Sequence, residues 1–194
     1  IILRLDAPLM SFGGGVVDQI NPVERFPGLA TLTGLVANAL GWDHREKSRL
    51  QNLQERLSFA ARWDLLPELL IDYQTVDLGQ DFMVGTGWTT RGAPEERGGE
   101  AKTGTHIRYR HFWANGEMTV AVSLSGEGDP SLDEVAEALR RPARPLFIGR
   151  NTCLPASRLF IAQRQTSSLK EAIRNAPLSV RAAAKRARSY QACW

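Results

Sequence analysis

The chain has 194 residues, of which 43% are hydrophobic and 23% charged, and this is the composition of a globular domain rather than of a disordered segment. The sequence has no apolar run of the roughly 18 residues that span a membrane and no signal-peptide pattern at its start, and two cysteines are too few for a disulfide framework or a zinc site. We therefore expect one soluble, cytoplasmic domain with no metal, no cofactor and no membrane contact.

Positive charge gathers in the last third of the chain. Residues 134–194 hold 12 Lys and Arg against 3 acidic residues, whereas residues 1–133 hold 12 against 18. A segment this basic indicates either a polyanionic partner such as nucleic acid or a solvated basic surface. Charge alone leaves both interpretations open.

The start of the chain is predicted to form a strand, a loop and two helices. Ile1, Leu3 and Leu5 alternate with Ile2, Arg4 and Asp6, which predicts a strand that Pro8 ends, and three glycines at 13–15 predict a loop. Apolar residues at helical spacing predict a helix over 31–41, capped by Thr31 and ended by Gly41. A second helical stretch follows directly.

Two strands and a long glycine-rich segment come next. Residues 59–63 and 69–76 have the pattern of strands, with a turn between them. Seven glycines and few core-forming residues then follow between 79 and 104. Because long structureless loops are uncommon inside a domain, we interpret 77–105 as a projecting arm or hairpin.

The sequence predicts a hairpin in the middle of the chain. Residues 107–113 and 118–124 alternate as strands, and Asn115-Gly116 between them is a strong two-residue turn signal. We therefore expect these two strands to pair with each other.

The C-terminal part is predicted to contain two capped helices. Ser131 with Glu134, and Ser168 with Glu171, have the spacing of capping boxes. Residues 145–161 read as two short strands around a turn at Gly149, and the tail at 178–190 has a helical spacing of basic residues. The whole order indicates an α+β fold with an antiparallel sheet and helices on one face.

A row of cations on the strand at 107–113 is the clearest candidate binding feature. Strand alternation places His106, Arg108 and Arg110 on one side, where arginine forks suit phosphates. Arg140, Arg141, Arg144 and Arg150 form a second cluster in the sequence. The aromatic residues Phe12, Phe82 and Trp88 fall in loops, where they either stack on bases or anchor the loop. The alternative for the strand is a face paired with the nearby Glu95, Glu96 and Glu100.

RNA cleavage without a metal is the second hypothesis. It needs a base for the 2′-hydroxyl and an acid for the leaving oxygen, and Lys102, His106, Tyr109 and His111 are the candidates. In a regular strand, His106 points away from both Tyr109 and His111. The sequence therefore favours binding over cleavage.

Several segments, in the right order, resemble one family. The opening strand and loop at 3–13 resemble an apolar strand followed by Gly-Pro and Gln-Ser-Trp-Gly in the CRISPR-associated Cas5 family, closest to its type I-E subfamily. Further resemblances lie at 25–27, 31–42, 72–75, 110–116 and 144–155.

This resemblance implies a single RAMP-type domain over 1–194 with a ferredoxin-like, RRM-related fold. It implies a projecting β-hairpin thumb at 77–105 and a basic tail at 178–194. Such subunits hold the 5′ handle of the CRISPR RNA at one end of the Cascade complex and contact a Cas7-type backbone subunit and the large subunit, meeting target DNA indirectly. Type I-E members are not known as nucleases, whereas type I-C relatives process precursor RNA.

The cation row and the resembling segments together predict the site residues. We expect no catalytic residue. The thumb is expected to meet neighbouring protein through Met83, Val84 and Trp88. The predicted RNA contacts are Met10, Ser11, Phe12, Gly13, Arg25, Lys102, His106, Arg108, Arg110, Arg144, Arg150, Asn151 and Thr152.

Overall fold

The computed structural model describes residues 1–15, 19–88, 93–102, 104–185 and 191–194. These divide into two compact units. The first comprises residues 1–14, 23–70 and 112–194, and the second comprises residues 15–22 and 71–111. Both contain β-strands and the first also contains helices, so the predicted α+β class is confirmed.

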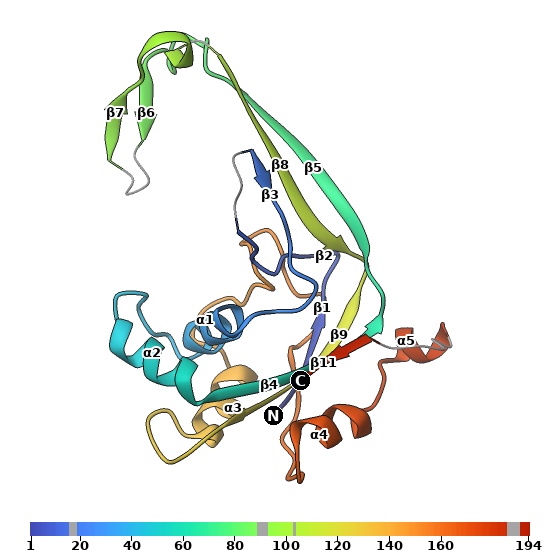
Figure 1. Cartoon of the computed structure of the whole chain (residues 1–194). Coiled ribbons are helices and arrows are strands. Elements are labelled where there is room, and N and C mark those ends of the chain that lie inside the picture. Colours follow the sequence, from blue (N-terminus) through green and yellow to red (C-terminus); the bar gives the residue numbers. More distant parts are fainter. Residues whose placement is uncertain (16–18, 89–92, 103, 186–190) are drawn as a thin grey trace. The chain divides into compact units, whose positions relative to one another are not determined.

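A five-stranded antiparallel sheet forms the centre of the first unit (Figure 1). Its strand order is β10-β1-β9-β4-β11. β1 and β4 are at both sides of β9, which is therefore buried on both edges and pairs along its whole length. The strands are β1 (Ile2–Asp6), β4 (Leu57–Leu65), β9 (Glu117–Leu124), β10 (Phe160–Ala162) and β11 (Gln191–Cys193).

One face of this sheet carries the main core. Alternate residues such as Leu3, Trp63 and Val120 point to it and pack against α1 (Leu29–Ala39) and α3 (Leu132–Arg140), with α2 (Lys47–Arg56) beside α1. Each fully buried side chain of this kind contributes about 1.5–3 kcal/mol. The helix predicted at 31–41 therefore exists, but it starts two residues earlier, with Gly28 rather than Thr31 as its N-cap.

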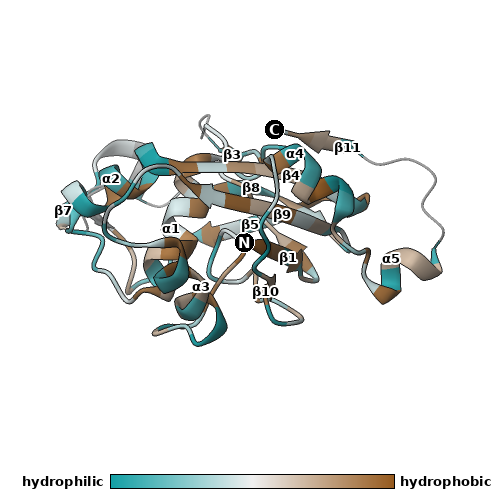
Figure 2. Ribbon diagram, turned by 90° about the horizontal axis from the view of Figure 1, so that it is seen from below, coloured by the Kyte–Doolittle hydropathy of each residue, from teal (hydrophilic) through white to brown (hydrophobic). Residues whose placement is uncertain are grey.

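The opposite face of the sheet is covered too, which corrects the expectation of helices on one face. α4 (Leu169–Asn175) packs there through Ala172 and Ile173, against small residues such as Ala60 and Ala121. Figure 2 shows α4 on the other side of β4 and β9 from α1 and α3. The small alanines allow the helix to approach the strands closely, and their weak pattern hid this second layer from sequence analysis.

Buried charged residues also lie on the face of the five-stranded sheet that α4 covers. Arg62 Nε donates to Asp64 Oδ1 at 2.6 Å, while its terminal nitrogens donate to the carbonyls of Ile173 and Ala176. These contacts fix the C-terminal end of α4 to the sheet. Because Arg62 and Asp64 are almost fully buried, removing either one would leave an uncompensated charge in the interior.

Glu117 is the centre of a second ionic group on this face. It lies 3.1 Å from Arg4 Nε and 3.6 Å from Arg181 Nε, and it accepts a hydrogen bond of 2.6 Å from the Ser179 hydroxyl. Ser179 also caps α5 (Val180–Ala184), so Glu117 ties the start of that helix to the sheet. Burial raises the pKa of Glu117 despite the two guanidinium groups.

The raised pKa predicts a specific pH dependence. Between the ordinary pKa of glutamate, about 4.3, and its higher folded value, the folded state holds a proton that the unfolded state has released. The contribution of Glu117 to stability is therefore complete below pH 4.3 and falls as the pH rises through the folded pKa. Urea unfolding measures the free energy of unfolding of the wild type and of Glu117→Gln. As the pH rises over this interval, that free energy should fall for the wild type relative to the variant. A pH-independent difference would contradict the assignment.

The hairpin predicted at Asn115-Gly116 is wrong. Asn115 does adopt a positive φ of 59°, but it joins strands of two different sheets. β9 pairs with β1 and β4, whereas the end of β8 (Thr105–Ala114) pairs with β2 (Leu9–Met10). β9 is buried on both faces, by apolar side chains such as Val120 on one and by the paired polar residues Glu117 and Thr119 on the other, and this burial makes it a central strand.

The predictions for the C-terminal part are mixed. Ser131 and Glu134 form the expected capping box. Ser168 accepts from the Glu171 backbone, but the Glu171 carboxylate accepts from Ser167 instead. Of the two strands predicted over 145–161, the structure has β10, and the tail prediction is met by α5 at 180–184, while 186–190 lie outside the described residues.

The second unit is organised around the long strand β8. β3 (Ile20–Asn21) runs parallel to β8, with Ile20 opposite Tyr109, and β5 (Glu68–Asp77) also pairs with β8. Between β5 and β8, β6 (Thr86–Trp88) and β7 (Pro94–Glu96) pair antiparallel, followed by a 3-10 turn over Gly99–Lys102. Within the described ranges, every helix of the protein is too short or too polar to cross a membrane.

Candidate nucleic-acid interface

The predicted cation row lies on β8 in the second unit. Because β8 is one continuous strand over Thr105–Ala114, His106, Arg108 and Arg110 alternate onto one face. His106 and Arg110 are exposed and Arg108 is half-buried. On the other face, the Tyr109 ring packs against Tyr73 with centroids 5.2 Å apart. The strand therefore has a cationic face and an aromatic face.

Two glutamates of the second unit, Glu95 and Glu96, were candidates to pair with this row. Among the described residues, neither Glu95 nor Glu96 forms an ion pair with Lys102, His106 or Arg110. Asp77 accepts hydrogen bonds from the Gly79 backbone and the Gln80 side chain, and these bonds lower its pKa. Within the described part of the chain, the expected pairing of Glu95 and Glu96 with these three basic residues is therefore not observed.

A cavity of about 590 Å³ lies beside the start of β8 in the same unit. Val76, Leu78 and Met83 give it an apolar lining. Its charged and titratable lining residues are Arg97, His106 and Glu95, so basic groups and a carboxylate line the same cavity. Of the other predicted thumb residues, Val84 is 45% exposed, and Trp88 lies in β6 with a side chain outside the description. Phe82 is 81% exposed and therefore does not anchor its loop.

A second group of predicted residues surrounds the turn at Gly149 in the first unit. The turn is bound to the loop after β2, because Ser11 N–H donates to the Ile148 carbonyl at 3.0 Å. Gly149 has a φ of 101°, and a Cβ there would lie 1.6 Å from the Ser11 carbonyl oxygen. This contact between two backbones requires glycine. Asn151 and Thr152, which follow Gly149 in the chain, are exposed on the surface.

Arg150 and Arg25 also belong to this part of the first unit. The Arg150 guanidinium lies over the Phe112 ring, 4.8 Å from its centroid. Arg25 is exposed, and its carbonyl accepts a hydrogen bond of 3.1 Å from Trp63 Nε1. Aromatic residues therefore hold the Arg150 side chain, through Phe112, and the Arg25 backbone, through Trp63.

The structure corrects the expectation for the loop at 10–13. Met10 and Phe12 are completely buried, and Ser11 is buried as well, so their side chains belong to the core and do not face a ligand. Phe12 packs against Trp63 with centroids 6.1 Å apart, which supports the anchoring role. Gly13 is exposed and pairs through its backbone with Val23.

The arginine cluster predicted around residue 144 separates into different roles. Arg144 donates to the carbonyls of Trp42 and Gly41, at 2.8 and 2.9 Å, and so closes the C-terminal end of α1. This contact accounts for Arg144 without RNA. It joins segments far apart in the sequence, so sequence analysis had no signal for it.

The candidate cleavage residues are held on opposite faces. β8 keeps its alternation from His106 to His111, which separates His106 from Tyr109 and from His111. Burial raises the pKa of the Cys153 thiol, which opposes a nucleophilic role for it. Among the described residues, no three His, Cys, Asp or Glu side chains come together as a metal site.

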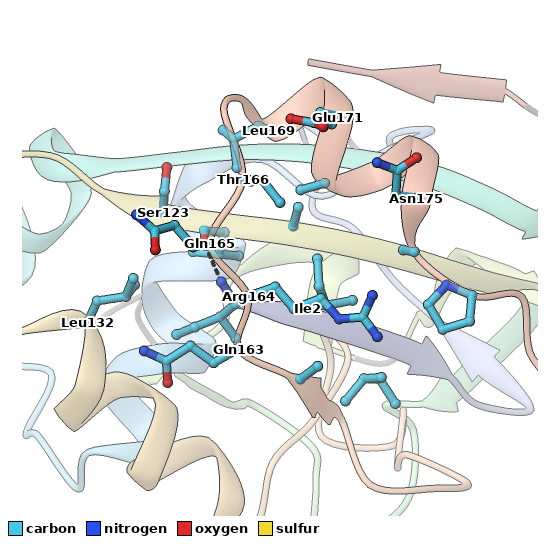
Figure 3. A pocket seen from close by; sticks show the side chains of 18 residues that line it. Ile2, Ser123, Leu132, Gln163, Arg164, Gln165, Thr166, Leu169, Glu171 and Asn175 are labelled. Carbon is cyan, nitrogen blue, oxygen red and sulfur yellow. Dashed lines mark hydrogen bonds between the residues drawn. The ribbon is translucent and has the colours of Figure 1, made fainter.

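Another cavity, of about 580 Å³, lies on the α4 side of the first unit (Figure 3). Ile2 and Ser123 come from the sheet, Leu132 from the start of α3, and Glu171 and Asn175 from α4. The segment from Gln163 to Thr166 lines the cavity between β10 and α4. Its polar lining residues are the amides Gln163, Gln165 and Asn175, the hydroxyls Ser123 and Thr166, and one residue of each charge, Arg164 and Glu171.

Comparison with known proteins decides the family. The sequence pattern of the family described as "CRISPR-associated protein (Cas_Cas5)" matches residues 1–194. The chain belongs to the CRISPR-associated Cas5 family. This Cas5 chain is 29% identical over 177 residues to the Escherichia coli (strain K12) protein "CRISPR system Cascade subunit CasD", a match that covers 90% of this chain and 75% of that protein.

Two solved structures resemble this Cas5 chain. A chain of a "CRISPR RNA-guided surveillance complex" superposes with a TM-score of 0.68 at 26% identity, covering 91% of this chain and 68% of the other. A structure described as "Crystal structure of Cas protein" gives a TM-score of 0.57 at 21% identity, over 89% and 68% of the two chains, and shows likeness of fold.

Proposed function

We propose that this Cas5 chain is a structural subunit of a type I-E-like Cascade complex and holds the 5′ handle of its CRISPR RNA. The single observation that carries the proposal is the cationic face of β8 in a Cas5 family member. The similarity to a protein named as a Cascade subunit, and to a chain of an RNA-guided surveillance complex, supports the assembly.

In this proposal, phosphates of a single-stranded segment bind along β8. Arg108 and Arg110 offer planar donor forks, and His106 and Lys102 extend the row. In the first unit, backbone N–H groups and the side chains of Asn151 and Thr152 give the turn at Gly149 donors for RNA as well. Unpaired bases present faces and edges for stacking and hydrogen bonding, and the exposed Phe82 ring suits such stacking.

We assign the pair β6–β7 and its flanks to a thumb of a ferredoxin-like, RRM-related RAMP fold. Val84 is 45% exposed in this region, and burial of exposed apolar surface against a partner is favourable. The thumb would contact a Cas7-type backbone subunit, and the large subunit and target DNA would be reached within the cytoplasmic complex.

The proposal also holds that this chain does not cut RNA. Cleavage needs an acid and a base at one scissile bond, and β8 turns His106 away from Tyr109. The competing function is a metal-independent endoribonuclease that processes precursor CRISPR RNA.

Incubation with repeat RNA in EDTA distinguishes these functions. We expect the purified chain to bind the RNA and leave it intact over hours, and we expect no cleavage by His106→Ala or Tyr109→Phe either. Specific cleavage that either variant abolishes, while the exposed control His44→Ala retains it, would establish the endoribonuclease. Purified complex that carries no RNA would instead favour a protein-only adaptor.

A further inference from the structure

A cavity between the end of α3 and the chain before β10 has a distinctive chemistry. Its volume is about 580 Å³, and it lies entirely within the first unit. Buried leucines from both sides line it, and arginines stand at its rim. The lining residues are Leu139, Arg140, Arg141, Pro142, Leu146, Pro155, Ser157, Arg158, Leu159 and Phe160.

Both walls of this cavity are held by the fold. On one side, Leu139 packs into the core from α3. On the other, the segment before β10 is bound to β1, because Ala156 N–H donates to the Asp6 carbonyl and Arg4 N–H to the Leu159 carbonyl, each at 2.8 Å. The cavity is therefore preformed, which lowers the entropy cost of binding.

The rim carries a surplus of positive charge. Glu137 is shared by Arg140, at 3.4 Å, and Arg141, at 3.8 Å, so one carboxylate faces two guanidinium groups. Arg158 makes no hydrogen bond or ion pair within the described part of the chain. The rim thus keeps two uncompensated cations around an apolar floor.

The floor suits an apolar side chain better than a base. The polar edges of a base would be buried against Leu139, Leu146 and Leu159 without hydrogen-bond partners, which costs free energy. The Phe160 ring is covered by the Arg140 guanidinium, 4.3 Å from its centroid, so its face is taken. An apolar anchor flanked by carboxylates would satisfy both floor and rim, as at many protein interfaces.

We propose that this cavity docks an acidic segment of a partner protein that inserts one bulky apolar side chain between α3 and the chain before β10. The site is separate from the residues assigned to RNA above. It therefore goes beyond the proposed RNA-binding function and does not depend on it.

The test uses the full chain and a synthetic acidic peptide with a single central phenylalanine between runs of glutamate. Isothermal titration calorimetry should show binding. In NMR spectra, the backbone amide chemical shifts that change on binding should be those of residues 139–142 and 155–160. Arg141→Glu with Arg158→Glu should weaken binding by at least about tenfold, and so should alanine in place of the peptide's phenylalanine. Circular dichroism checks the fold of the variant. Arg45→Glu with Arg174→Glu, which replaces two exposed arginines of the first unit, is the matched control and should bind normally.

Three outcomes would overturn the proposal. The first is a wild-type chain that fails to bind the peptide. The second is binding that the control Arg45→Glu with Arg174→Glu weakens as much as the cavity variant, because this would indicate attraction by net charge alone. The third is a titration in which a hexauridylate RNA changes the amide chemical shifts of the cavity residues and the peptide does not. The cavity would then be a nucleic-acid binding site.

Discussion

The double variant Arg108→Ala with Arg110→Ala is expected to lose most of its affinity for the 5′ handle RNA. Two hydrogen-bonded ionic contacts, at roughly 1.5 kcal/mol each, correspond to a loss of about a hundredfold at moderate salt. The affinity should also depend less steeply on salt. The slope of log affinity against log salt concentration should become shallower by about 0.7 for each lost phosphate contact. Filter binding at several salt concentrations measures both effects.

A variant with the same change in net charge separates local contact from general attraction. Arg45 and Arg174 are exposed arginines of the first unit, and the Arg45→Ala with Arg174→Ala variant also removes two charges. We expect this control to retain nearly all of the affinity and slope. If it weakens binding as much as the β8 variant, or if the β8 variant keeps the wild-type slope, then β8 is not the phosphate track.

Gly149→Ala is expected to give the largest loss of stability from a single methyl group. The new Cβ would meet the Ser11 carbonyl oxygen, and the backbone there has a φ of 101°, which side chains rarely adopt. Strain and displacement of two joined loops should cost at least about 3 kcal/mol, or roughly 6–12 °C in Tm. The turn at Asn151 and Thr152 would move with it, so RNA retention should fall as well.

Gly126→Ala provides the control for backbone strain. Gly126 also has a positive φ, of 66°, but a Cβ there would meet nothing within 4 Å. We expect a loss of about 1 kcal/mol from this change. Equal losses in urea unfolding of the two variants would show that the close approach of Gly149 to Ser11 has no special weight.

Sequence patterns correctly predicted those features that depend on residues close together in the chain. The alternation in β1, the stripe of α1 and the capping box at Ser131 depend on residues within one or two turns of each other. The cation row on β8 was predicted for the same reason, because strand alternation alone places it. These features needed no knowledge of distant contacts.

Features set by distant contacts were missed. The Asn115-Gly116 turn signal is real at the level of φ, but burial on both faces made β9 a central strand of another sheet. Arg144 was assigned to RNA because its partners, the carbonyls of Gly41 and Trp42, belong to a remote helix end. A signal was present for Met10 and Phe12, since apolar residues next to a strand commonly extend the core.

Cross-linking of the assembled complex tests the central claim most directly. Ultraviolet irradiation joins RNA to the side chains that touch it, and mass spectrometry of digested complexes identifies the peptides and nucleotides. We predict adducts between the repeat-derived 5′ segment of the guide and peptides that contain 104–111 and 148–153. Adducts confined to other surfaces of this chain, or nucleotides from the middle or 3′ end of the guide on β8, would contradict the account.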